Sequence, residues 1–243
     1  MRRILVAFLL LGLAAGSAVA QKTKPWNEWS EKEAAKILND SPWGQTQTEG
    51  DSAPAQTSAI TQVAAQNAAN RQLSREGESG EAKPDRVVKY RTRFLTAKPV
   101  RGAFARLLLL QKNTTDEKLA TELQGFVDRD FGDYVVVVFS IEASNSGLVA
   151  PMMQVLSKAS ADFFKDKVYL ERKDGKRLAL ADYRPPGPDG MGAKFVFMRT
   201  LEGQPFLTTE SDNVRFVAAI NDKVKLNMRY KVSEMIYDGK LEY

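Results

Sequence analysis

The hydrophobic pattern centres on one run in the middle of the chain, Tyr134-Val-Val-Val-Val-Phe-Ser-Ile141. Branched side chains such as valine fit an extended backbone well, so four valines in succession favour a strand. The run has no polar face, which is typical of a strand that is covered on both sides. We therefore predict a central buried strand around which the rest of the domain packs.

Helical spacing is found on both sides of this strand. Pro99 stands where a helix would begin, and an apolar stripe follows it at intervals of three and four residues. Thr114 and Glu117 have the spacing of a capping box, which predicts the start of a second helix. A third helix is expected from residue 151 to about residue 164, after a turn at residues 144–147. We expect these helices to cover the central strand.

From residue 165 onward, apolar residues recur at every second position. Asp174-Gly175 separates two such stretches and is typical of a two-residue hairpin turn, and Asp238-Gly239 predicts another hairpin. Strands joined by tight turns pair in antiparallel fashion. The predicted class is therefore α+β, with helices on a central buried strand and a C-terminal antiparallel β-meander.

All three tryptophans of the chain, Trp26, Trp29 and Trp43, precede this domain. A short amphipathic helix is predicted between the last two, because Ser30 and Glu33 have capping-box spacing. A helix of this length is not stable alone in water. Its apolar face and the indole rings are therefore expected to dock on a surface.

The composition changes after the last tryptophan. Residues 44–84 are rich in Gln, Ala, Ser, Thr, Gly and Glu and contain few large apolar residues, which is typical of a linker. The predicted organisation is a signal peptide (1–20), a tryptophan-rich helical segment (21–43), a low-complexity linker (44–84) and an α+β domain (85–243).

The first twenty residues have the three parts of a secretory signal. Arg2 and Arg3 precede an apolar core from Ile4 to Ala14, and Ala18-Val-Ala20 is a small-residue cleavage site. The core is shorter than the ~20 residues that a membrane span needs, so we predict cleavage and a secreted or periplasmic protein. Loss of the two arginines lowers the formal net charge from +5 to +3.

The chain contains no cysteine and no histidine. The absence of histidine excludes a Ser-His-Asp triad and every histidine-liganded zinc or haem site. The absence of cysteine excludes disulfides, thiolate chemistry and iron-sulfur clusters. We therefore predict neither a cofactor nor a metal, and we expect stability to come from a packed core.

Two stretches carry a resemblance to a known group. The first is Trp26-Asn-Glu-Trp-Ser-Glu-Lys-Glu-Ala-Ala-Lys-Ile-Leu-Asn-Asp-Ser-Pro-Trp43, and the second is the ending Met235-Ile-Tyr-Asp-Gly-Lys-Leu-Glu-Tyr243. They resemble a group of uncharacterised secreted bacterial proteins with the segment W-x-x-W-(S/T)-x-x-E-A-x-x-(I/L)-L-x-x-S-P-W after the signal. The resemblance covers both ends well and the middle loosely. It implies a bacterial envelope setting and no particular activity.

The tryptophan segment is the first candidate site. Tryptophan is common at protein interfaces because it combines a large apolar area with a polar N–H group. Two interpretations stay open: the segment packs on its own domain, or it docks on a partner such as an envelope protein or a glycan. The candidate docking anchors are Trp26, Trp29, Ile37, Leu38 and Trp43.

Two basic strand faces are the second candidate site. If the two strands were neighbours, their cations would bind an anionic polymer or a lipid head group. The alternative is a solvated outer face whose lysines discourage edge pairing. No aromatic residues lie among these cations on the same strand face, so nucleic acid is not a predicted partner. The cations are Lys89, Arg91, Arg93, Lys223, Lys225, Arg229 and Lys231.

The segment Asp128-Arg-Asp-Phe-Gly-Asp133 is a compact carboxylate cluster. It departs from the helix-loop-helix calcium pattern, because its glycine comes one position early and Phe139 stands where a glutamate ligand is needed. A turn with capping aspartates is the favoured interpretation. An acid/base pair of a glycan hydrolase, with Asp130 or Asp133 as one member, is the alternative.

Together these features predict an exported bacterial envelope protein without enzymatic activity. It would act as an interaction module whose tryptophan segment docks on its own domain or on a partner. The two alternatives are a carboxylate-dependent glycan hydrolase and a binder of anionic polymer or lipid head groups. The predicted partners are accordingly an envelope protein or an anionic polymer.

Overall fold

The computed structural model describes residues 24–50, 87–113 and 116–243; the predicted signal peptide and most of the predicted linker lie outside this part. Its helical elements are η1 (Trp26–Glu28), α1 (Glu31–Asn39), α3 (Lys98–Lys112), α4 (Glu117–Val127), α5 (Ser146–Lys158), α6 (Ala161–Phe164) and η2 (Val232–Glu234). Its strands are β1 (Gly44–Glu49), β2 (Val88–Phe94), β3 (Tyr134–Ala143), β4 (Val168–Arg172), β5 (Arg177–Arg184), β6 (Ala193–Met198), β7 (Thr200–Leu201), β8 (Gln204–Pro205), β9 (Asn213–Ala219), β10 (Lys225–Lys231), β11 (Ile236–Tyr237) and β12 (Lys240–Leu241).

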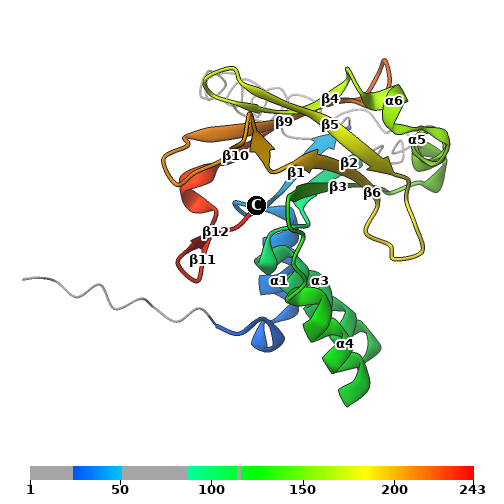
Figure 1. The fold of residues 1–243 in the computed structure, drawn as a ribbon. Coiled ribbons are helices and arrows are strands. Elements are labelled where there is room, and N and C mark those ends of the chain that lie inside the picture. Colours follow the sequence, from blue (N-terminus) through cyan, green and yellow to red (C-terminus); the bar gives the residue numbers. More distant parts are fainter. Residues whose placement is uncertain (1–23, 51–86, 114–115) are drawn as a thin grey trace, which may run out of the picture.

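Eight of the described strands form one antiparallel sheet in the order β1-β2-β3-β6-β5-β4-β9-β10. The sheet curls until its two edge strands approach each other (Figure 1). Gln45 of β1 donates a side-chain hydrogen bond to the carbonyl oxygen of Arg229 in β10. The hydroxyl of Tyr230 reaches across to Thr92 of β2. The sheet is therefore nearly closed.

The α+β class is confirmed, but a central strand covered by helices is the wrong architecture. The predicted central strand is β3, and it is one strand of the curled sheet between β2 and β6. Val135, Val137 and Phe139 are fully buried in the large core that the sheet encloses. An unbroken apolar run shows that a strand is buried; it does not show whether helices or other strands cover it.

Aromatic rings fill the interior of the curled sheet. Phe195 of β6 lies 5.2 Å from Phe164, 5.2 Å from Tyr183 and 5.6 Å from Phe216, measured between ring centroids. These rings come from α6, β5 and β9, so the cluster joins elements that are far apart in the chain. Such buried aromatic contacts supply much of the packing energy of a core.

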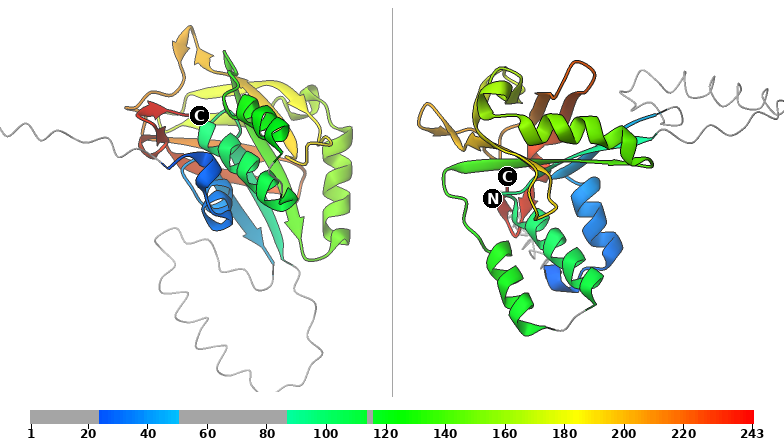
Figure 2. Two further views of the ribbon diagram at one scale, coloured as in Figure 1. Left: turned by 90° about the horizontal axis from the view of Figure 1, so that it is seen from below. Right: turned by 90° about the vertical axis from the view of Figure 1, so that its right-hand side faces the viewer.

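The helices lie in two groups on opposite sides of the sheet. α1, α3 and α4 pack together on one side, and α5 and α6 lie on the other (Figures 1 and 2). The N-cap of α4 is Asp116, so Thr114 as its cap is wrong. α5 begins at Ser146, five residues before the predicted start, so the predicted turn at residues 144–147 overlaps its first residues, and the helix predicted up to residue 164 is divided into α5 and α6. The side chain of Asn145 accepts from the amide of Gly147, a bond that N-caps share with simple turns.

The predicted linker begins too early, because its first six residues form β1. This polar strand pairs along its whole length with β2, from Gly44 opposite Arg93 to Glu49 opposite Val88. A Cβ atom added to Gly44 would lie 2.5 Å from the carbonyl oxygen of Leu38, so α1 packs directly against its backbone. The composition gave no sign of this strand, because β1 has no apolar pattern. It is held by main-chain hydrogen bonds to β2.

The predicted hairpins are confirmed. β4 and β5 pair around Asp174-Gly175, and β11 pairs with β12 around Asp238-Gly239. Asp238 has φ +48° and Gly239 has φ +75°, which is the backbone that a two-residue hairpin turn needs. Across the residues that the structure describes, no helix has the length and apolarity to cross a membrane.

Candidate functional site

The tryptophan segment packs on the domain. Trp26, Trp29 and Trp43 are all buried, and the N–H group of each indole donates a hydrogen bond. The acceptors are the side chain of Gln124 at 3.0 Å, the carbonyl of Lys24 at 3.0 Å and the carbonyl of Glu242 at 2.9 Å. Because the rings are buried and each N–H group has an acceptor, the indoles belong to the folded structure.

A glycine in α3 lets the segment come close. A Cβ atom added to Gly102 would lie 2.8 Å from the Cβ atom of Trp26 and 3.3 Å from the ring of Trp29. One turn further along α3, the side chain of Arg106 donates to the carbonyl of Trp29. Of the two remaining candidate anchors, Leu38 is buried and Ile37 is half-buried against the same core.

The last strands of the chain meet the tryptophan segment beside Trp43. The Trp43 ring lies edge-on to that of Tyr237, with 6.3 Å between centroids. The carboxylate of Glu242 accepts from the main-chain N–H of Lys98 at 2.8 Å, in the first turn of α3. A carboxylate is favourable there because helix N-termini carry unpaired N–H groups and a positive dipole end. The structure thus brings the tryptophan segment into contact with the last residues of the chain, 235–243.

Arg93 of β2 does not belong to an open basic face, so its place in the predicted binding surface is wrong. Its side chain is buried and donates to the carbonyl of Leu38 at 2.7 Å, to the hydroxyl of Ser140 at 2.9 Å and to the side-chain oxygen of Asn39 at 3.0 Å. Burial, with a smaller effect of the neighbouring Arg91, lowers the pKa of Arg93 to about 10. The alternation of apolar and basic residues predicted that this face of β2 points to solvent, but α1 covers Arg93.

The other cations of the two predicted basic strands also do not form one surface. β1 lies between β2 and β10, so the strands are not neighbours. On β2, Arg91 pairs with Glu142, and Lys89 lies 4.0 Å from the same carboxylate. On and beside β10 the exposed cations are Lys223, Lys225, Arg229 and Lys231. The seven-cation surface is therefore wrong, because an unpredicted strand separates its halves.

The carboxylate cluster forms a turn and an ion pair. Asp130 accepts from the main-chain N–H of Gly132 at 2.8 Å. Asp128 lies 2.7 Å from the side-chain nitrogen of Lys98, and the hydrogen bonds from Lys98 and then Gln124 lower the pKa of Asp128. Within the described ranges, no group of three carboxylates is placed to hold a metal ion.

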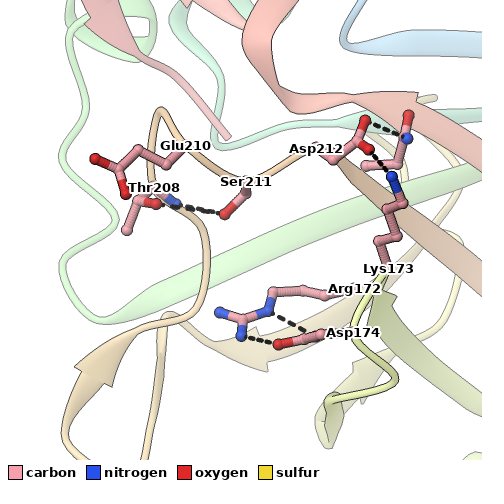
Figure 3. A pocket seen from close by; sticks show the side chains of 8 residues that line it. Arg172, Lys173, Asp174, Thr208, Glu210, Ser211 and Asp212 are labelled. Carbon is pink, nitrogen blue, oxygen red and sulfur yellow. Dashed lines mark hydrogen bonds and ion pairs between the residues drawn. The ribbon is translucent and has the colours of Figure 1, made fainter.

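One polar hollow, of about 370 Å³, lies between the β4–β5 turn and the loop before β9 (Figure 3). Its charged groups pair mainly with one another. Arg172 binds Asp174 and also donates to the carbonyl of Phe206 at 2.8 Å, and Lys173 pairs with Asp212. These pairs tie the turn to the loop, so the hollow offers a ligand few free groups.

A larger groove, of about 670 Å³, lies on the outer face of β3 and β6. Its floor follows two cross-strand pairs, Val136 with Val196 and Tyr134 with Met198. The two valines are buried, whereas 48% of Tyr134 and 41% of Met198 are exposed. The apolar walls are completed by Leu95, Phe126, Phe131 and Met191. An apolar surface therefore runs from the protein interior into solvent.

Charged residues form the rim of this groove. Asp189 lies 2.8 Å from Lys194, and Asp182 lies 3.6 Å from Arg184. Burial opposes ionisation of Asp189, but the bonds from Lys194 and from the amide of Met191 lower its pKa below the ordinary value. Arg129, which is exposed, forms no ion pair with any carboxylate in the described part of the chain. Arg129 is thus the cation that remains free to meet a ligand.

A second, polar hollow of about 360 Å³ adjoins the groove, because Arg129 and Phe131 line both. Arg101, which is only 5% exposed, lines the polar hollow and lies 5.2 Å from the centre of the Phe131 ring. Burial lowers the pKa of Arg101, whose guanidinium donates to three main-chain carbonyls. Arg199 also lines this hollow. The carboxylates of Asp128, Asp130 and Glu242 line this hollow as well. The site therefore has an apolar half and a half with charges of both signs; we call the whole the two-part groove.

Among the residues that line the two-part groove, the sequence marked only Asp130 as a candidate, and as a member of a hydrolase acid/base pair rather than a ligand-binding residue. Tyr134, Val136 and Val138 alternate on the outer face of β3, and the burial of that strand was expected. The partial exposure of Tyr134 at the start of β3 was not expected, because an aromatic residue at the end of a strand gives no sign that it is exposed. Arg129 was seen only as part of the carboxylate cluster. Its role depends on the approach of β6 and the β5–β6 loop, which no local pattern shows.

No family model matches the chain, and no curated protein matches it. Among solved structures, the chain is similar to a novel protein of unknown function from Burkholderia pseudomallei K96243. The sequences are 12% identical and the TM-score is 0.37; the similarity covers 70% of this chain and 86% of the other. A likeness this distant says nothing about what the protein does, so function has to be inferred from the site.

Proposed function

We propose that this chain is an exported envelope binding module without enzymatic activity, and that its ligand site is the two-part groove. The observation that carries the proposal is the junction at Arg129 and Phe131, where an apolar hollow and a charged hollow share a wall and the exposed Arg129 forms no ion pair with a described carboxylate. The burial of the three indoles supports docking of the tryptophan segment on its own domain. The segment then holds the fold together and leaves the groove as the binding surface.

The ligand is an amphiphile with one apolar chain and an anionic head. The apolar half has the volume of typical small-molecule sites, which are about 300–1,000 Å³ and mostly lined by apolar side chains. Tyr134 and Met198 would lose their exposure to water on binding, which is favourable for large apolar side chains. The unpaired Arg129 would attract the anionic head, with Arg101 behind it.

The exported setting rests on the predicted signal at residues 1–20.

The hydrolase alternative has less support. Asp130 is engaged in a turn, and Asp128 is engaged by Lys98. Asp128, a neighbouring carboxylate that could complete the pair with Asp130, has a lowered pKa, whereas a glycosidase acid needs a raised one.

The test is calorimetric titration of the mature chain with dodecanoate and with dodecanol, which share the chain and differ in the head. Wild type is expected to prefer dodecanoate. Arg129→Ala should reduce that preference about tenfold, since one charge-assisted contact contributes about 1.4 kcal/mol. Met198→Asp should weaken both ligands, because it places a charge on the apolar floor.

Leu148→Asp is the matched control, because Leu148 is an apolar residue of α5 that is 36% exposed and lies outside the groove. It should bind both ligands like wild type. The proposal fails if wild type binds neither ligand at millimolar concentration. It also fails if Leu148→Asp and Met198→Asp weaken binding equally.

A further inference from the structure

A second surface is built by β5, β4, β9 and β10, which lie side by side (Figure 1). Their solvent-facing positions carry a cluster of cations. We define the basic face by Arg177, Arg215, Lys225, Arg229 and Lys231. Only the last three of these belong to the surface expected from the sequence, and none lines the groove.

One row of this face crosses four strands. Arg229 of β10 is directly opposite Arg215 of β9, Arg215 is opposite Glu171 of β4, and Glu171 is opposite Arg177 of β5. Opposite residues in antiparallel strands share a face and interact. Three guanidinium groups and one carboxylate therefore lie in the same row. The Arg229–Arg215 pair places like charges opposite each other, which is destabilising without a counter-charge.

Glu171 holds two of these arginines in place. Its side chain is only 6% exposed and binds Arg177 at 2.6 Å and also Arg215. The Arg177 guanidinium lies 4.3 Å from the centre of the Tyr169 ring. Fixed planar guanidinium groups lose little side-chain freedom when they bind an anion. Their side chains remain 58% and 39% exposed, so they are ordered and still accessible.

The second arm of the basic face runs along β10. Lys225, Arg229 and Lys231 alternate with buried residues, so they all point to solvent. Alternate positions on a strand are about 7 Å apart. Lys231 pairs with Glu234 at 2.7 Å, whereas Lys225 and Arg229 form no ion pair with a described carboxylate. Positive charge therefore occupies three of the four outward positions from 225 to 231, with Asn227 at the fourth, and it is only partly neutralised.

We propose that the basic face binds a linear anionic polysaccharide. The row across four strands and the arm along β10 form an elongated positive surface, which complements a linear chain that carries carboxylate or sulfate groups. A membrane surface fits less well, because the described exposed large apolar residues (Leu110, Tyr134, Leu148, Phe163, Met198 and Ile236) all lie outside these four strands. Nucleic acid also fits less well, since Arg177 covers the ring of Tyr169 and leaves it unable to stack on a base.

The test measures binding of the mature chain to heparin, as a sulfated polysaccharide, and to alginate, as a carboxylated one, at several salt concentrations. Wild type is expected to bind at least one of them in 50 mM NaCl, with an affinity that falls as salt rises. A Lys225→Glu, Arg229→Glu double variant should bind at least tenfold more weakly. Its slope of log affinity against log salt should be smaller by about two.

The matched control is a Lys32→Glu, Lys118→Glu double variant, which changes net charge by the same amount. Both lysines are exposed in the first turns of α1 and α4, where an acidic residue favours the helix. This variant should bind within about twofold of wild type. Equal losses in the two double variants would overturn the proposal, because net charge alone would then explain binding.

Two further results would also overturn it. One is absence of binding by wild type to both polysaccharides at low salt. The other is tighter binding to phosphatidylglycerol vesicles than to either polysaccharide, which would make the occupant a membrane surface. Thermal melting of each variant confirms that it is folded before its affinity is compared.

Discussion

At the residue scale, Arg93 shows how position in the fold changes the role of a charge. The sequence places it on a solvated basic strand face. In the structure it is 5% exposed and joins the end of α1 to β2 and β3 through three hydrogen bonds. A charged donor with several acceptors contributes more to stability than a neutral one. Arg93 therefore stabilises the docked tryptophan segment and is not a ligand group.

The replacement Arg93→Ala is expected to lower the free energy of unfolding by about 3 kcal/mol, since it leaves the buried carbonyl of Leu38 without its partner. Urea denaturation of the mature chain measures this loss. The control Lys89→Ala, on the same strand and more exposed, should cost less than about 1 kcal/mol. Equal losses in the two variants would contradict the role given to Arg93.

At the element scale, α1 is held by its own N-terminal cap as well as by the domain. The Ser30 hydroxyl accepts from the amide of Glu33 at 3.2 Å, and the Glu33 carboxylate accepts from the amide of Ser30 at 2.6 Å. The bond from the Ser30 amide, followed by that from Lys24, lowers the pKa of Glu33 to about 2. The capping box predicted from the sequence is confirmed.

This pKa makes the stability of α1 dependent on pH. A carboxyl whose pKa is lower in the folded state stabilises the fold above its unfolded pKa, near 4.5, and loses that contribution as pH falls toward 2. Wild type should therefore be more stable than Glu33→Gln at pH 6, and the difference should shrink by pH 3. Urea midpoints at both pH values measure it. In the control Glu31→Gln, which leaves the box intact, the difference from wild type should not shrink in this way.

At the scale of the whole molecule, the sheet closes through side chains. The Tyr230 hydroxyl is fully buried and bonds both the hydroxyl and, at 3.2 Å, the carbonyl of Thr92, although the two strands are not paired. The Tyr230 ring also lies edge-on to Phe94, with 4.8 Å between centroids. Burial raises the pKa of Tyr230, so the phenol stays protonated and remains a donor. These contacts connect β10 to β2, although β1 lies between the two strands.

Removal of this hydroxyl by Tyr230→Phe is expected to lower the free energy of unfolding by about 1.5 kcal/mol, because Thr92 is left buried without its partner. Guanidinium denaturation provides the measurement. Tyr169→Phe is the control, since Tyr169 lies half-exposed on the outside of the sheet, and it should change stability by less than about 0.5 kcal/mol. A Tyr230→Phe variant as stable as the control would show that closure depends on other contacts.

Local chemistry explains which features the sequence alone determined. The α1 cap, the hairpins at Asp174-Gly175 and Asp238-Gly239, and the burial of the valine run in β3 depend on neighbouring residues and backbone preference. Those preferences are written in short stretches of sequence. They were therefore predictable without knowledge of the fold, as was the α+β class.

Only the tertiary structure decided the closure of the sheet, the burial of Arg93, the strand β1 and the two-part groove. Each depends on which distant segments meet: α1 over β2, β10 beside β1, and the β5–β6 loop beside Arg129. Alternation along a strand shows that two faces differ, but it does not show what covers either face. Contacts between remote segments are set by packing over the whole chain, and for that reason the two surfaces proposed to bind ligands form only when the chain is folded.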